Sequence, residues 1–226
     1  MIAELSKVLD GRVTELITIS SADASAPHFL IFHFIDVALR NNRDVILVSA
    51  RRGRRSNRVI ASKLAIRSSE KIKFINIRDH LKDDLLSSGR HLLKSLDKAI
   101  GENIESCGAP ISLMFDDFSI IHDIGVTATD SMNFLRKIEK KLWERHPDPM
   151  MVVTFCSDCP LIPIMQLKSD VVLQTSLIGT GFAKDVTGKL SLRMREDDAA
   201  APLIYHYRLT DRSVQVMPPG LLRPAL

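Results

Sequence analysis

The sequence predicts an α/β domain built on a mostly parallel sheet, with helices on both faces and antiparallel strands at its C-terminal edge. Two observations carry this prediction. Short apolar segments alternate with helical segments up to about residue 175, and only strand-like segments follow. The composition, 45% apolar and 26% charged over 226 residues, allows a substantial core. Since no repeat or composition shift marks a linker, a single domain over residues 1–226 is expected.

Short apolar or alternating runs predict the strands. In the alternating part they are 16–20, 45–49, 72–77, 111–115, 151–155 and 171–175. Three more, with turns but no helix between them, are 189–194, 203–209 and 213–217. Strands separated by helices favour parallel pairing through right-handed crossovers, whereas the last three favour antiparallel pairing at one edge.

Helical spacing of apolar residues predicts four helices. They cover 29–40, 56–66, 85–104 and 130–145. The first is apolar nearly all round, so we expect it to be buried, and Pro27 suits its start. His28 and His33 lie at this apolar helix, and we expect both to be hydrogen-bonded core residues.

One short segment holds most of the excess positive charge. The formal charge is +4, from 31 basic and 27 acidic residues. Five arginines lie within eight residues, namely Arg51, Arg52, Arg54, Arg55 and Arg58. Without them the remaining charges nearly balance, so the chain is not basic all over.

This arginine tract follows the second predicted strand, which places it at the carboxyl edge of the sheet, where ligands of α/β proteins usually bind. Several guanidinium groups can engage several phosphates, so the five arginines are candidate nucleic-acid-binding residues. No aromatic residue interleaves them, so base stacking by this segment is not expected. The alternatives are a solvated loop or a salt-bridged interface with an acidic partner.

The first strand-to-helix loop, residues 20–26, is the usual position of a phosphate-binding loop. It contains no glycine and no lysine, and the carboxylate of Asp23 would repel a phosphate. The segments 179–181 and 188–189 look like fragments of nucleotide loops, but their spacing is wrong and a strand follows, so we interpret them as turns. The chain therefore lacks a Walker A loop.

Asp116 and Asp117 follow the fourth predicted strand in the manner of a Mg²⁺-binding strand end. Without a phosphate to bridge, the metal would lose its other ligands. We therefore expect these aspartates to cap the next segment or to face a partner subunit.

Other chemistry has little support. Cys156 and Cys159 form a C-x-x-C, but with only Cys107 elsewhere they cannot complete a four-thiolate zinc site. No serine lies in a G-x-S-x-G elbow. We assign no catalytic residue, cofactor or metal.

Targeting signals are not evident. No apolar run is long enough for a membrane span, and residues 1–10 lack the pattern of a signal peptide. Three cysteines do not make a disulfide scaffold, so we expect a soluble protein of a reducing compartment.

A family resemblance appears in the C-terminal third. Residues 179–190, GTGFAKDVTGKL, resemble the "TGF-x-x-DV-x-G-x-L" segment of the family of the sixth subunit of the Elongator complex. The resemblance continues in 205–208 (YHYR), 211–214 (DRSV) and the final 224–226 (PAL). A looser match covers 27–40, in the position of the family's first helix, and 115–119 (FDDFS), which is similar to its "VDDLS".

The resemblance implies a RecA-like ATPase fold that has lost its nucleotide motifs. It also implies partnership with Elongator subunits four and five in a hetero-hexameric ring that binds tRNA and docks on the catalytic part of Elongator. That assembly modifies the wobble uridine of tRNA, and catalysis belongs to another subunit, which uses acetyl-CoA and a radical SAM centre. The chain would then be a non-catalytic subunit of the cytoplasm, and also of the nucleus.

Two other functions remain open at this point. One is a nucleotide-binding ATPase of the same fold, which the missing lysine in 20–26 disfavours. The other is a stand-alone RNA-binding module, in which the arginine tract would act without partners.

Overall fold

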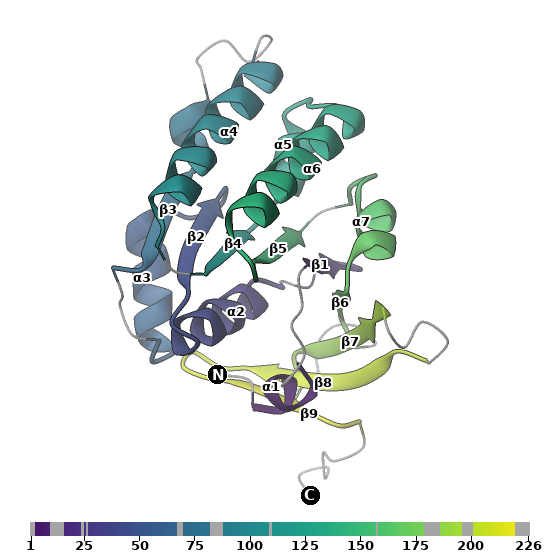
Figure 1. Ribbon diagram of the computed structural model, residues 1–226. Helices are drawn as coiled ribbons and strands as arrows, with labels where there is room; N and C mark the ends of the chain where they lie inside the picture. Colours follow the sequence, from purple (N-terminus) through teal and green to yellow (C-terminus); the bar gives the residue numbers. More distant parts are fainter. Residues whose placement is uncertain are drawn as a thin grey trace, which may run out of the picture.

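A single nine-stranded sheet organises the chain (Figure 1). The computed structural model describes residues 3–9, 16–23, 25, 27–66, 70–81, 88–108, 110–156, 158–178, 186–195 and 201–219. The strand order is β3-β2-β4-β5-β1-β6-β7-β8-β9. The first six in this order pair in parallel, and β7, β8 and β9 continue the sheet antiparallel.

The parallel strands are mostly short runs of apolar and β-branched residues, as buried parallel strands require, whereas the antiparallel strands include polar residues. They are β1 (Leu16–Ser21), β2 (Asp44–Ser49), β3 (Ile72–Asn76), β4 (Ile111–Phe115), β5 (Met150–Phe155), β6 (Val171–Ser176), β7 (Gly188–Met194), β8 (Leu203–Leu209) and β9 (Val214–Met217). The last three were predicted as antiparallel edge strands, and the pairing confirms this.

Eight helical elements lie in the described part of the chain. They are α1 (Ala3–Leu9), α2 (His28–Arg40), α3 (Arg54–Lys63), the 3₁₀ helix η1 (Ile77–His80), α4 (Ser88–Ser106), α5 (Ser119–Asp123), α6 (Ala128–Arg145) and α7 (Ile162–Lys168). The sequence prediction missed α1, η1, α5 and α7, which have ten residues or fewer. One or two turns are too short to show a 3.6-residue period clearly.

Helices cover both faces of the sheet, and each face has its own core. On one face, α4, α5, α6 and α7 pack on the strands, and Leu113 and Phe115 of β4 point into this layer. On the other face lie α1, α2 and α3, and Met114 of β4 points there. The alternation of neighbouring β4 residues between two buried layers explains why its sequence is apolar throughout.

The connections that follow the neighbouring strands β1 and β5 cross opposite faces of the sheet. From β1 it passes through α2 on one face to β2, and from β5 it passes through α7 on the other face to β6. Since β1 and β5 are neighbours, a crevice is expected at their carboxyl ends, which is the usual ligand position in such sheets. Among the described residues, no helix combines the length and apolar character needed to cross a membrane.

Candidate functional site

The β1–α2 loop, where a phosphate loop would lie, is closed by its own side chains. Oδ1 of Asp23 accepts a hydrogen bond of 2.8 Å from the backbone N–H of Ser25, and Oδ2 accepts one of 2.7 Å from the N–H of Leu177. The hydroxyl of Ser25 donates to Thr175 at 2.8 Å. In a phosphate loop, backbone N–H groups donate to a bound anion; here the N–H groups of Ser25 and Leu177 donate to the carboxylate of Asp23 instead.

The electrostatics of Asp23 agree with this role. Burial acts to raise its pKa, but the hydrogen bonds from Leu177 and Ser25 outweigh it, and the pKa lies below its usual range. The carboxylate is therefore charged at neutral pH, and a phosphate in the same place would meet like charge. This agrees with the sequence prediction that the chain lacks a Walker A loop.

The two aspartates after β4 accept hydrogen bonds from the backbone around them. Asp116 accepts a hydrogen bond from the Ser49 hydroxyl and one of 2.8 Å from the N–H of Ala50. Asp117 accepts one of 3.1 Å from the N–H of Ser119, at the start of α5. The Asp117 contact agrees with the predicted contact to the next segment. Asp116 instead binds the residues at the end of β2, which was not predicted, and so ties the ends of β2 and β4 together.

Arg51 is bound to the buried end of β4. Its Nε lies 2.5 Å from Oδ2 of Asp117, whose side chain is 0% exposed, while 43% of the Arg51 side chain is exposed. Burial acts to lower the pKa of Arg51, but the hydrogen bond and charge of Asp117 raise it overall. Arg51 is therefore fixed by an ion pair within the chain.

The other arginines are presented at or on α3, which begins at the carboxyl edge as expected. Arg54, Arg55 and Arg58 lie on this helix and are exposed, whereas Arg52 precedes it and is half-buried. Within the described part of the chain, none of the three helical arginines forms an ion pair. Of the five predicted residues, Arg54, Arg55 and Arg58 are thus exposed on one helix, whereas Arg51 is paired with Asp117.

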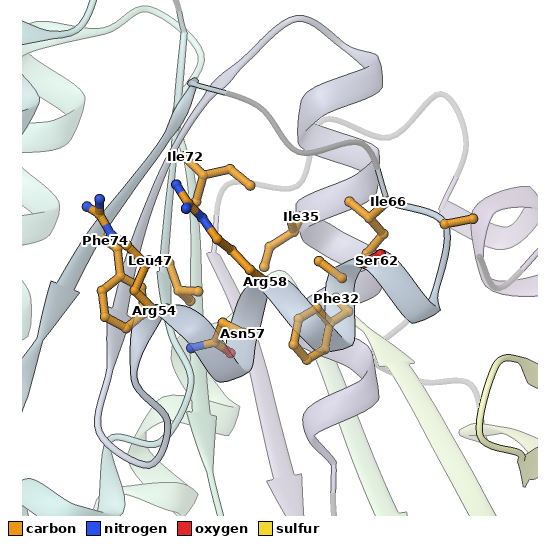
Figure 2. Close-up of a pocket in the computed structure, with 12 residues that line it drawn as sticks. Phe32, Ile35, Leu47, Arg54, Asn57, Arg58, Ser62, Ile66, Ile72 and Phe74 are labelled. Atoms are coloured by element: carbon orange, nitrogen blue, oxygen red, sulfur yellow. The ribbon is translucent and has the colours of Figure 1, made fainter.

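A pocket of about 280 Å³ lies between α3 on one side and α2, β2 and β3 on the other (Figure 2). We call it the α3 pocket. Its walls include Phe32 of α2, Leu47 of β2 and Phe74 of β3, and Arg54 and Arg58 line it from α3. Nothing in the sequence analysis pointed to this pocket.

His28 and Cys156 meet beside the carboxyl ends of β1 and β5. The Nε2 of His28 lies 3.6 Å from the Sγ of Cys156. Burial, followed by the nearby charges of Arg52 and Arg51, lowers the pKa of His28 to about 4. Burial and then the charge of Asp117 raise the pKa of Cys156. Both groups are neutral at pH 7, so the geometry offers no activated thiolate.

The described residues also give no support for metal chemistry. No group of three or more His, Cys, Asp or Glu side chains among them is placed to hold a metal ion. Cys107, Cys156 and Cys159 are free thiols, so the C-x-x-C forms no disulfide in this structure.

The prediction for His33 was partly wrong. The residue is buried in α2, as expected, but neither ring nitrogen has a hydrogen-bond partner within the described part of the chain. Instead, the ring packs edge-on against Phe34, with centroids 5.2 Å apart. Burial lowers its pKa to about 4, so the ring is neutral and its unsatisfied nitrogens cost less than a buried charge would.

The described parts of the C-terminal segments that carry the family resemblance meet in the antiparallel edge. Gly188, at the start of β7, pairs with Tyr207 of β8, and a Cβ at Gly188 would lie 2.5 Å from the tyrosine hydroxyl. The N–H of Thr187 donates to the carbonyl of Tyr207 at 2.8 Å. Residues 179–185 and 224–226 lie outside the described residues.

Comparison with known proteins gives one relative by sequence. No family model matches the chain. The chain is 22% identical to a protein of Rattus norvegicus in an alignment that covers 96% of this chain and 93% of that protein. The chain resembles Elongator complex protein 6. The resemblance inferred from the C-terminal motifs is thereby confirmed across nearly the whole length.

Solved structures confirm the RecA-like fold. An uncharacterized protein from Pyrococcus horikoshii, solved with an unknown peptide, has a TM-score of 0.69 at 14% identity, over 97% of this chain and 98% of that one. A KaiC-like protein from the same organism gives 0.64 at 13%, over 90% of each chain. The flagellar accessory protein FlaH from Methanocaldococcus jannaschii gives 0.66 at 16%, over 94% of each.

Proposed function

We propose that this chain is a non-catalytic RecA-like subunit of an Elongator-type assembly that binds tRNA and supports modification of its wobble uridine. Its partners would be Elongator subunits four and five, in a hetero-hexameric ring that docks on the catalytic Elongator subcomplex. The single observation that carries the proposal is the similarity to Elongator complex protein 6 over nearly the whole chain.

The site geometry supports a non-catalytic role. Asp23 accepts the backbone hydrogen bonds that a nucleotide phosphate would need. Asp116 and Asp117 are buried and are engaged by neighbouring backbone and by Arg51. In such a RecA-like chain the sheet is present, and internal hydrogen bonds take the place of ligand binding at the β1–α2 loop.

The three exposed arginines of α3 support contact with RNA. Arg54, Arg55 and Arg58 present positive charge on one short helix, without ion pairs to other described residues. Phosphate contacts by such groups give affinity without base specificity, as a subunit that helps hold tRNA requires.

The test uses the ring assembled with both partner subunits. Replacing Arg54, Arg55 and Arg58 together by Ala should weaken tRNA binding by about tenfold or more and flatten its salt dependence. The matched control removes three exposed positive charges from the opposite face, in α4 and α6: Lys94, Arg136 and Arg145. Equal losses in the two variants, or no loss in the α3 variant, would contradict the RNA role of the tract.

A further inference from the structure

The α3 residues that line the α3 pocket are charged, polar or small. Arg54, Asn57, Arg58 and Ala61 line the α3 pocket at spacings of three and four residues, so they share one face of the helix. Of all α3 residues, only Asn57 is buried. Ile60 of the same helix packs against the core, but beside it Asn57 and Ala61 are too small to fill the space above α2, β2 and β3, so a hollow remains there.

The floor and walls of the α3 pocket are apolar. Phe32 and Ile35 come from α2, Leu47 from β2, and Ile72 and Phe74 from β3. The volume of about 280 Å³ exceeds the roughly 150 Å³ of an engineered apolar cavity that binds benzene, and it approaches the lower limit for pockets that bind small molecules. The space therefore suits a compact apolar group rather than a few water molecules.

Positive charge is confined to one side of this pocket. Figure 2 shows the side chains of Arg54 and Arg58 extending from α3 toward the side where Ile72 and Phe74 lie. None of the described lining residues is acidic, and neither arginine forms an ion pair with a described residue. Two unpaired guanidinium groups beside an apolar cavity match an anionic head with an apolar body.

We propose that the α3 pocket binds a small amphipathic anion, with its apolar body against Phe32, Leu47 and Phe74 and its carboxylate or phosphate head between Arg54 and Arg58. This site does not rest on the proposed function, since it belongs to the single chain and needs neither RNA nor partner subunits.

The test measures binding of four probes to the full chain by calorimetry at fixed ionic strength. Decanoate and decyl phosphate carry the proposed chemistry with two different heads, decanol lacks the charge, and decyltrimethylammonium reverses it. One saturable site is expected for at least one anion, with affinity at least tenfold above that of decanol and of the cation. The tighter of the two anions identifies the head that the site prefers.

Variants separate this site from general binding of detergent-like molecules. The double variant R54Q/R58Q, at two exposed positions, should weaken binding of the preferred anion at least tenfold and leave decanol within about twofold. Ala61→Phe should fill the pocket and abolish binding of both. The control R136Q/R145Q on α6 should bind like the unmodified chain. Equal affinity for anion and decanol, no saturable anion binding, or an equal loss in the control would overturn the proposal.

Discussion

The Nε of Arg51 lies 2.5 Å from the Oδ2 of Asp117, and this ion pair ties the start of the arginine tract to the buried end of β4. Asp117 also accepts a hydrogen bond from the N–H of Ser119, so one carboxylate holds the tract and the start of α5. The arginine that comes first in the tract is therefore a structural residue. The three on α3 are the ones free to meet another molecule.

Replacing Arg51 by Ala should lower the free energy of unfolding by about 1–3 kcal/mol, because the carboxylate of Asp117 would remain buried without its charged partner. Arg55→Ala should change it by less than about 0.5 kcal/mol, because Arg55 is exposed on α3. Chemical denaturation of both variants measures the difference.

Asp117→Asn provides the second half of this test. It removes the charge while keeping an oxygen that can accept from Ser119. In that background Arg51→Ala should cost clearly less than in the native chain. Equal costs in both backgrounds would show that the ion pair is not what stabilises Arg51.

Acid should destabilise the fold between about pH 6.5 and pH 4. His28 and His33 have pKa values of about 4 in the folded chain, lowered first by burial, against about 6.5 when unfolded. The unfolded chain therefore binds protons more readily in this window, and stability is full above pH 6.5, falls toward pH 4 and levels off below.

The His33→Leu variant isolates one of these two contributions. Its free energy of unfolding, measured by denaturation across pH 4–7, should fall less steeply with acid than that of the native chain. The raised pKa of Asp116, due mainly to burial, acts in the opposite direction and is the same in both proteins. Parallel pH profiles would contradict the titration assigned to His33.

Gly188→Ala should destabilise the antiparallel edge. The new Cβ would lie 2.5 Å from the hydroxyl of Tyr207 and 2.6 Å from the backbone carbonyl of Ser176. The carbonyl cannot swing away as a flexible side chain would, so about 1–3 kcal/mol or more is expected to be lost. Because of that carbonyl, adding Tyr207→Phe should not restore the melting temperature. Ala at Gly53, where a Cβ would meet nothing within 4 Å, is the matched control.

ATP should not bind the isolated chain at millimolar concentration in calorimetry. Asp23→Ala should loosen the β1–α2 loop, because Ser25 and Leu177 lose an acceptor, yet it should not create ATP binding, since the loop still lacks the lysine and the glycines of a phosphate loop. Tight ATP binding by the native chain would instead favour the ATPase alternative.

Periodicity was sufficient to predict the central fold. The continuous apolar run 111–115 and the helical spacing of apolar residues in α6 predicted elements within a residue or two of those observed. The absence of helical segments between the strand-like segments after β6 predicted the antiparallel edge. Helices as short as α5 and α7 carry too few turns to be recognised this way.

The site was less predictable because it depends on side-chain contacts between distant segments. The loss of the phosphate loop was visible in residues 20–26, but the pairing of Asp23 with Leu177 joins positions 154 residues apart. Arg51 differs from its neighbours in the tract because it pairs with Asp117, which is distant in the sequence. The α3 pocket likewise depends on residues of α2, β2 and β3 that lie opposite α3. A signal for the pocket was nevertheless present in Arg54, Asn57, Arg58 and Ala61, which share one face of α3 and include no large apolar residue.

Membership of the ring is the central claim, and co-purification followed by native mass spectrometry tests it most directly. Co-expressed with Elongator subunits four and five, the chain should be recovered in an assembly of six chains that contains all three subunits, and it should behave poorly when expressed without them. A well-behaved monomer that ignores both partners would contradict the account.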